Sequence, residues 1–199
     1  MSLTVHEYAH ARMALYFGDP TAKLAGRVTL NPLKHLDLFG TLALLLAGFG
    51  WAKPVPVNTR NMRNPRLGDI MVSFAGPASN LLLAVLAVLA LRLISIFGDD
   101  HDLASMSTVL VYLAIINTSL CVLNMLPLFP LDGHHILREF LPASEQMSYM
   151  QWQVKYGITI LLVLLFGPDV LSRFAGHRVF DPLSWMMNSG IDLIFKIAG

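Results

Sequence analysis

Two long apolar segments, residues 69–97 and 108–128, constrain the fold of this chain more than any other feature. Each reaches the roughly 20 residues that a helix needs to cross a bilayer. Of the 199 residues, 55% are hydrophobic and only 14% are charged, whereas soluble domains carry about 25% charged residues. The chain is therefore expected to be an all-α polytopic membrane protein.

Shorter apolar segments bring the expected total to four to six membrane segments, with no room for a separate soluble domain. A weaker third crossing is expected around residues 156–166, and residues 183–197 form either a last crossing or an interfacial helix. Residues 38–51 are apolar but only about 14 residues long, which favours a re-entrant or interfacial piece.

A small β element is expected beside these helices. Residues 25–30 read as a short strand, and the prolines of residues 53–58 favour an edge strand or an extended segment. The two extended pieces could pair. The first helix is expected to end at Gly18-Asp19-Pro20, because glycine followed by proline is a stop signal.

The charge pattern sets an orientation and excludes one class of partner. Residues 18–68 carry seven Lys or Arg, while residues 98–107 carry three aspartates and no Lys or Arg. By the positive-inside rule, residues 18–68 face the cytoplasm. The net charge of +1 argues against nucleic acid as a partner. Cys121 is the only cysteine, so neither an intrachain disulfide nor a Cys-based zinc site can form.

The segment His6-Glu7-Tyr8-Ala9-His10 is an H-E-x-x-H pattern close to the N-terminus. On a helix, residues four apart lie about 40° apart around the axis and about 6 Å apart along it, so both imidazoles can bind one metal ion. A carboxylate at Glu7 would then lie beside that ion and could take a proton from water.

A two-histidine site needs a third protein ligand and an open position for water. Counting crossings from the cytoplasmic side brings residues 124–133, Asn-Met-Leu-Pro-Leu-Phe-Pro-Leu-Asp-Gly, back to the side where the first helix ends. Asp132 is the only carboxylate in that segment.

These motifs resemble the site-2 protease family of intramembrane zinc metalloproteases, in which H-E-x-x-H pairs with a distant N-x-x-P-x-x-P-L-D-G. Gly76-Pro77-Ala-Ser-Asn80 resembles the family's G-P-x-x-N segment. Gly26-Arg27 and residues 31–37 resemble its short bacterial branch, which lacks a PDZ domain. The likeness covers about residues 4–140.

The resemblance implies one protease domain, 1–199, with a catalytic core at about 4–140 and C-terminal membrane helices at about 150–199. It implies one zinc ion held by His6, His10 and Asp132, with Glu7 as the catalytic base. It also implies cleavage of peptide bonds in or near membrane segments of other proteins, in a bacterial inner membrane. The alternative is a non-catalytic protein that binds or transports metal, for which further ligands along a pore are expected.

Two amides and several histidines have more than one interpretation. Asn124 and Asn80 either bond neighbouring helices or contact the substrate carbonyl and its oxyanion. Surface or supporting positions around the site are expected for four residues: His35, Asp37, His134 and His135. His101 is expected in a solvated loop. The sequence does not identify the substrate, the cleavage site or the oligomeric state.

Overall fold

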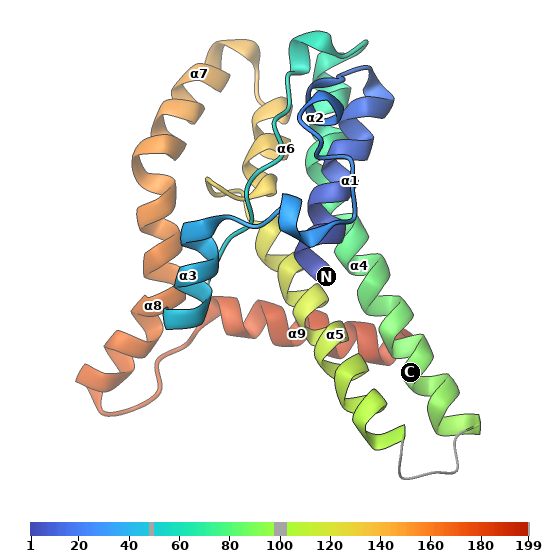
Figure 1. Ribbon diagram of the computed structural model, residues 1–199. Helices are drawn as coiled ribbons and strands as arrows, with labels where there is room; N and C mark the ends of the chain where they lie inside the picture. The colour runs from blue at the N-terminus through green and yellow to red at the C-terminus, as the bar shows by residue number, and fades with distance from the viewer. Residues whose placement is uncertain (48–49, 98–102, 199) are drawn as a thin grey trace. The chain divides into compact units, whose positions relative to one another are not determined.

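The computed structural model describes residues 1–47, 50–97 and 103–198, which are mostly helical (Figure 1). The chain forms two compact units, Met1–Ser79 and Asn80–Gly199, and the long helix α4 runs through both. The first unit contains α1 (Ser2–Phe17), α2 (Thr21–Leu24), η1 (Pro32–Lys34), α3 (Leu38–Ala47), η2 (Thr59–Asn61) and the start of α4 (Pro65–Phe97). The second contains the rest of α4 with α5 (Leu103–Asn124), α6 (Asp132–Phe140), α7 (Ala143–Trp152), the π-turn η3 (Gln153–Gly157), α8 (Ile158–Ala175) and α9 (Pro182–Ala198).

The first helix ends where its sequence predicts. Gly18 adopts the left-handed conformation, with φ at 105°, and its amide bonds back to the last turn of α1. Asp19 is fully buried just beyond that turn. Its carboxylate accepts hydrogen bonds from the amide of Asn58 at 2.7 Å and from the side chain of Asn61 at 2.9 Å. The end of α1 is thereby tied to residues 58–61.

The expected β element is not confirmed in the described residues. At residues 25–30 the amides of Gly26 and Arg27 bond back to Lys23 and Ala22, so the chain turns after α2 instead of offering a strand edge. Residues 53–58 are extended but do not form a β-ladder, since two of them are prolines, which lack an amide donor. Within the described ranges, Leu36 and Ala52 form one isolated antiparallel bridge.

Helix α3 occupies the short apolar segment after His35. It is ten residues long, which gives about 15 Å of helix, half of what a bilayer core requires. Asp37 caps it, accepting a hydrogen bond from the amide of Gly40 at 2.8 Å. A re-entrant or interfacial placement of this piece remains a prediction, and residues 48–49 lie outside the described ranges.

The second unit is built on close packing of small side chains between α4, α5 and α9. Buried Ala84, Ala87 and Val88 of α4 meet Ala114 of α5 and Ile194 of α9. Small residues allow helix backbones to approach closely and to form many van der Waals contacts. In lipid these contacts stabilise helix association, because lipid tails are as apolar as the side chains and the hydrophobic effect no longer favours it. Figure 1 shows α9 lying across α5 instead of running beside it. The segment expected at 183–197 is therefore a helix that packs across α5, and its placement as a last crossing or an interfacial helix stays a prediction.

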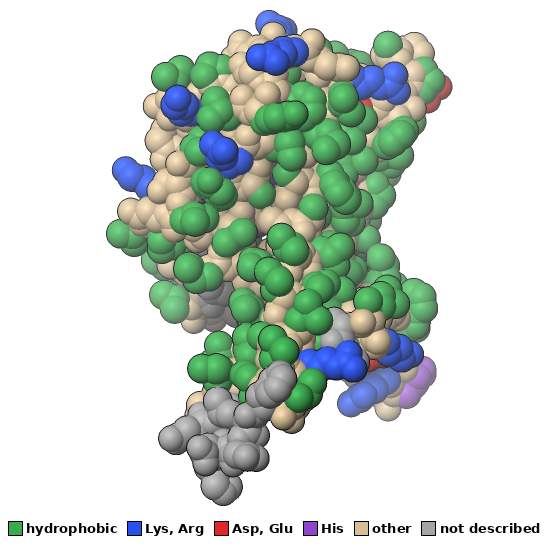
Figure 2. Space-filling view, turned by 90° about the vertical axis from the view of Figure 1, so that its right-hand side faces the viewer, with side chains coloured by type: hydrophobic (Ala, Val, Ile, Leu, Met, Phe, Trp, Pro, Cys, Tyr) green, Lys and Arg blue, Asp and Glu red, His purple; other side chains and the backbone are tan. Residues whose placement is uncertain are grey.

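Three helices in the described residues are long and apolar enough to span a membrane: Pro65–Ile96, Ser105–Asn124 and Ala143–Ala175. The first two confirm the crossings expected at 69–97 and 108–128. The third is much longer than the segment expected at 156–166, because α7, η3 and α8 form one continuous rod. In the most apolar 18-residue stretch of each helix, only 6% to 22% is buried inside the protein. Apolar side chains cover much of the face in Figure 2. The protein is a multi-pass membrane protein, but the expected four to six crossings are not confirmed.

Candidate active site

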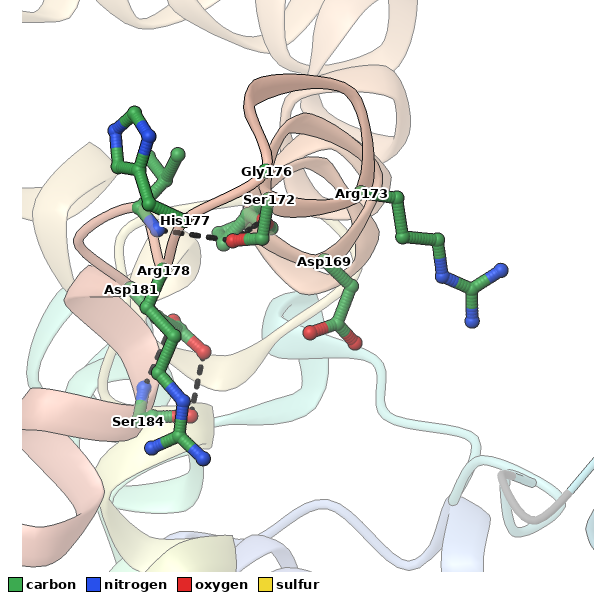
Figure 3. A pocket seen from close by; sticks show the side chains of 10 residues that line it. Asp169, Ser172, Arg173, Gly176, His177, Arg178, Asp181 and Ser184 are labelled. Carbon is green, nitrogen blue, oxygen red and sulfur yellow. Dashed lines mark hydrogen bonds between the residues drawn. The ribbon is translucent and has the colours of Figure 1, made fainter.

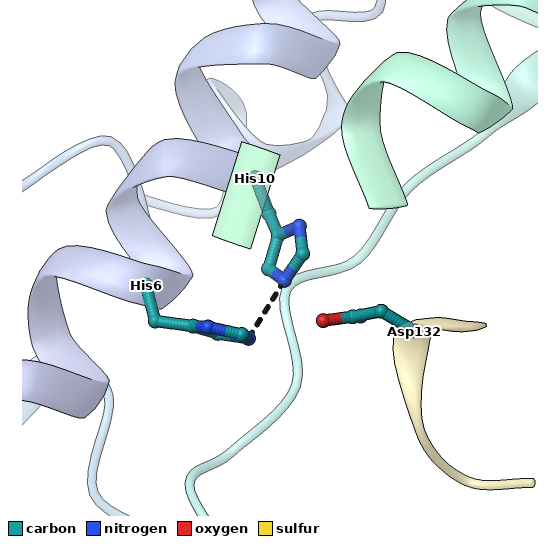
Figure 4. A group of neighbouring side chains, drawn as sticks. All are labelled: His6, His10 and Asp132. Atoms are coloured by element: carbon teal, nitrogen blue, oxygen red, sulfur yellow. Dashed lines mark hydrogen bonds between the residues drawn. The ribbon is translucent and has the colours of Figure 1, made fainter. Parts of the chain in front are cut away.

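The two histidines of the H-E-x-x-H segment converge on one point. They lie one turn apart on α1, both are buried, and their Nε2 atoms are 3.0 Å apart (Figure 4). The ring centroids are 4.6 Å apart and the rings are nearly perpendicular. Two nitrogens bound to one tetrahedral zinc at about 2.0–2.1 Å lie about 3.3 Å apart. The pair is therefore close to the geometry of a shared metal ion.

A backbone carbonyl of α4 fixes the orientation of His10. Nδ1 of His10 lies 2.6 Å from the carbonyl oxygen of Val72, and because that oxygen can only accept, Nδ1 carries the proton. Nε2 of the neutral ring then keeps its lone pair and faces Nε2 of His6. Metal-binding histidines typically donate their second nitrogen in this way, which sets the tautomer and holds the ring.

Gly76 makes room for both rings. An added Cβ at this position would lie 2.5 Å from Cε1 of His10 and 2.6 Å from Cε1 of His6, and closer still to Nε2 of His10. Real side chains do not approach so closely, so only glycine lets α4 lie against the imidazole pair. The G-P-x-x-N segment therefore contributes to the site through the absence of a side chain at its first position.

Glu7 is the acid of the same turn. Its side chain is 9% exposed, and the carboxylate makes no hydrogen bond to any of the described residues. Its oxygens remain available to a water molecule beside the histidine pair.

Asp132 belongs to the second unit, where it is the half-buried first residue of α6 (Figure 4). The next residue, Gly133, is buried against the chain that leaves α5: an added Cβ would overlap the carbonyl oxygens of Met125 and Leu126 and lie 2.6 Å from the carbonyl carbon of Met125. Glycine after the aspartate lets α6 begin in contact with that backbone, which fixes where the carboxylate starts.

The two amides singled out by the sequence are both engaged in helix contacts. Nδ2 of Asn80 donates to Oδ1 of Asn117 at 2.8 Å, and both residues are fully buried between α4 and α5. Nδ2 of Asn124 donates to the carbonyl of Leu120 within its own helix at 3.0 Å. These contacts favour the helix-bonding interpretation of Asn80, while in Asn124 the side-chain nitrogen, not the carbonyl oxygen, makes the bond to Leu120.

The remaining histidines take structural positions. His35 is buried, and its Nε2 lies 2.8 Å from the carbonyl oxygen of Thr29. Nδ1 of His134 donates to the carbonyl of Leu131 at 2.6 Å, in the turn before α6. Burial, helped by electrostatic repulsion from neighbouring His135, lowers the pKa of His134 and so favours its neutral form. His101 lies outside the described ranges.

Gln153 is a buried polar residue that the sequence analysis did not single out. It lies in the π-turn between α7 and α8 and bonds the backbone of residues 127–129. One sequence signal could have pointed to Gln153: it is a side-chain amide within a long apolar segment, and such a group is rare there unless it is hydrogen-bonded. It could therefore have been predicted as a residue that bonds another segment of the chain.

A polar hollow of about 750 Å³ lies at the junction of α8 and α9 (Figure 3). Asp181 caps α9 there by accepting hydrogen bonds from Ser184, and these bonds lower the pKa of the Asp181 carboxyl. Most of the lining side chains are exposed. None of the residues predicted for the active site lines this hollow.

The fold and the histidine pair define a class: a multi-pass membrane protein with a metallopeptidase motif on the buried face of a helix. Comparison with known proteins agrees. The model of Peptidase family M50, the site-2 proteases, matches residues 1–168. The chain therefore belongs to peptidase family M50.

Curated relatives support this assignment over nearly the whole chain. It is 44% identical to "Putative zinc metalloprotease YwhC" of Bacillus subtilis (strain 168), over 99% of this chain and 87% of that protein. It is 34% identical to "Putative zinc metalloprotease Rip2" of Mycolicibacterium smegmatis, over 100% of this chain and 75% of that protein. "Zinc metalloprotease MJ0392" of Methanocaldococcus jannaschii is 28% identical, over 84% of this chain and 40% of that protein. No solved structure gave a significant match.

Proposed function

We propose that His6, His10 and Asp132 hold the zinc of this protease and that Glu7 is its catalytic base. The protein is a zinc-dependent intramembrane metalloprotease of the site-2 type, as its family and relatives support. The observation that carries the residue assignment is the convergence of the two buried Nε2 atoms to 3.0 Å on one helix, with the second nitrogen of His10 held by a backbone carbonyl.

The donor set fits a catalytic zinc. Two imidazoles and one carboxylate leave a fourth position for water or substrate, which distinguishes catalytic from closed structural sites. Asp132 is proposed as the third ligand because its motif carries the only carboxylate between residues 124 and 133. Zinc, when bound there, supplies Lewis-acid chemistry: it polarises a carbonyl and makes a water molecule easier to deprotonate.

Glu7 would perform the proton transfers. It takes a proton from the attacking water and then delivers that proton to the amine that leaves when the peptide bond breaks. Its place directly beside His6 on α1 keeps the carboxylate within the same turn as the metal ligands. Burial of the turn excludes bulk water, which strengthens each of these electrostatic interactions.

The substrates we propose are membrane-spanning segments of other proteins. A helical segment hides its carbonyls in internal hydrogen bonds, so it must unwind before hydrolysis. The extended residues 53–58 lie in the same unit as the histidine pair and are proposed to hold the unwound strand by backbone pairing. Val57 packs with the buried cluster of Ala14, Met62 and Val72, which anchors that segment.

The proposed location is a bacterial inner membrane, with the active site toward the cytoplasm. This orientation rests on the excess of Lys and Arg in residues 18–68 over residues 98–107. The alternative of a metal transporter is not favoured by the comparisons. Within each compact unit, the described residues hold no further cluster of three His, Cys, Asp or Glu donors that could continue a path.

Metal analysis tests the assignment. The purified wild-type protein is expected to hold about one zinc per chain, and His10→Ala to lose most of it. His177→Ala is the matched control, because His177 is an exposed histidine outside the proposed site. Cleavage of a membrane-segment peptide should stop with a chelator and return with zinc. Full zinc content in His10→Ala at wild-type affinity would refute the site.

A further inference from the structure

Both polar atoms of the Gln153 side chain form hydrogen bonds with the loop that precedes Asp132. Oε1 accepts a hydrogen bond from the amide of Phe129 at 2.8 Å, and Nε2 donates to the carbonyl of Pro127 at 2.7 Å. Nε2 also donates to the hydroxyl of Tyr149 at 2.8 Å. The side chain is 1% exposed. One buried amide thus replaces the backbone partners that a β-strand would supply to this loop.

We infer that Gln153 is a positioning residue for Asp132: it holds residues 127–129 and thereby sets the point from which the carboxylate enters the site. The inference rests on the proposed role of Asp132 as a zinc ligand. It assigns to the C-terminal membrane rod a part in the active site that neither the motifs nor the family assignment records.

The connection from Gln153 to Asp132 is short and rigid. The amide of Leu131 bonds to the carbonyl of Leu128 at 2.8 Å, and the carbonyl of Leu131 accepts from Nδ1 of His134 at 2.6 Å. Pro127 and Pro130 restrict φ on the same stretch. Once Gln153 fixes Pro127 and Phe129, few backbone rotations remain before Asp132.

The π-turn makes this contact possible. In η3 the helix carries one extra residue per turn, and such turns often occur at functional sites. Gly157 packs against the same loop, since an added Cβ there would lie 2.9 Å from Oε1 of Gln153 and 3.0 Å from the carbonyl oxygen of Phe129. The missing side chain lets the loop approach close enough for Gln153 to bond both backbone groups.

The test measures zinc affinity by competition with a chelator in detergent-solubilised protein. Gln153→Met removes both loop bonds at nearly constant volume, and loss of such a supporting contact typically weakens metal binding about 10- to 100-fold. Gln153→Glu, protonated in this apolar setting, keeps one donor and one acceptor and should retain more affinity than Gln153→Met. Gln146→Met is the matched control: Gln146 lies seven residues earlier on the same rod, and its side chain donates to the carbonyl of Leu141, outside residues 127–132. Its zinc affinity should equal that of wild type.

A double-mutant cycle separates positioning from general damage. If Gln153 acts through Asp132, then Gln153→Met should weaken zinc binding at least about 10-fold in the wild type but less than about 2-fold in the Asp132→Asn background. An equal effect in both backgrounds, or no effect in either, would overturn the inference.

The same experiment keeps the two proposals apart. If Asp132→Asn alone leaves zinc affinity unchanged, the proposed ligand set fails. If Asp132→Asn weakens binding and Gln153→Met does not, only the positioning role fails. Should Gln153→Met not fold, Gln153→Glu carries the cycle, because it lacks one of the two amide N–H donors. A loss of zinc affinity that disappears in the Asp132→Asn background would support the positioning role, whereas equal losses in both backgrounds, or no loss in either, would overturn it.

Discussion

Replacing Gly76 with alanine is expected to disable the zinc site from the opposite helix. The change adds one methyl group on α4, directly over the histidine pair of α1. No ligand, base or charged group is altered. Any loss of zinc must therefore come from displaced imidazoles, which makes Gly76→Ala a direct test of the packing described here.

The size of the effect follows from the distances. The new Cβ would lie 2.5 Å and 2.6 Å from the Cε1 atoms of His10 and His6, whereas ordinary contact begins at 3.4 Å, so the rings and α4 must separate by about 0.8–0.9 Å. Metal sites tolerate deviations of only about 0.2 Å in ligand distance. Overpacking typically costs about 1–3 kcal/mol, which corresponds to about a 5- to 150-fold loss of zinc affinity.

Zinc affinity, measured by competition with a chelator, reports the displacement of the imidazoles. Thermal unfolding of the zinc-free protein reports the cost of overpacking. Gly167→Ala is the control, because Gly167 also precedes a proline within an apolar helix, and an added Cβ would make an ordinary contact of 3.5 Å with Val163. The control should bind zinc like wild type. Wild-type zinc affinity in Gly76→Ala would show that α4 does not press on the histidines.

Three further predictions address the surroundings of the site. Hydrogen bonds outweigh the burial that would raise the pKa of Asp19 and instead lower it below 3.8, so its stabilising contribution is complete at neutral pH and disappears as the pH falls below that value. Asp19→Asn should therefore lower the melting temperature at pH 7, and a gap from wild type that stays constant below pH 4 would contradict this. Gly133→Ala should displace the start of α6 and reduce bound zinc in metal analysis, while unchanged zinc would oppose a packing role. Val55→Pro should slow cleavage of a helical membrane substrate more than cleavage of a short extended peptide, and equal slowing would exclude strand pairing at residues 53–58.

Local sequence signals predicted the elements whose cause is local. The end of α1 follows from Gly18, which adopts the left-handed conformation that glycine favours. The spans at 65–96 and 105–124 follow from long segments of mostly apolar composition. The facing of His6 and His10 follows from helical spacing alone, because both residues belong to one helix.

Most features that the sequence did not predict depend on distant contacts, but residues 25–30 are an exception. They have strand-like composition, yet the amides of Gly26 and Arg27 bond back to the carbonyls of Lys23 and Ala22 in α2, only a few residues earlier. The amide pair of Asn80 and Asn117, 37 residues apart, becomes visible only once α4 and α5 pack together. Gln153 reaches residues 127–129 because it lies in a π-turn, and no periodicity in the sequence predicts that turn.

Comparing Glu7→Gln with wild type, in both zinc content and peptide cleavage, tests the central claim most directly. The amide keeps the shape of the side chain but cannot accept a proton from water. The account predicts that the variant holds about one zinc per chain, as wild type does, and no longer cleaves a membrane-segment peptide. Cleavage at the wild-type rate by a zinc-loaded Glu7→Gln protein would contradict it.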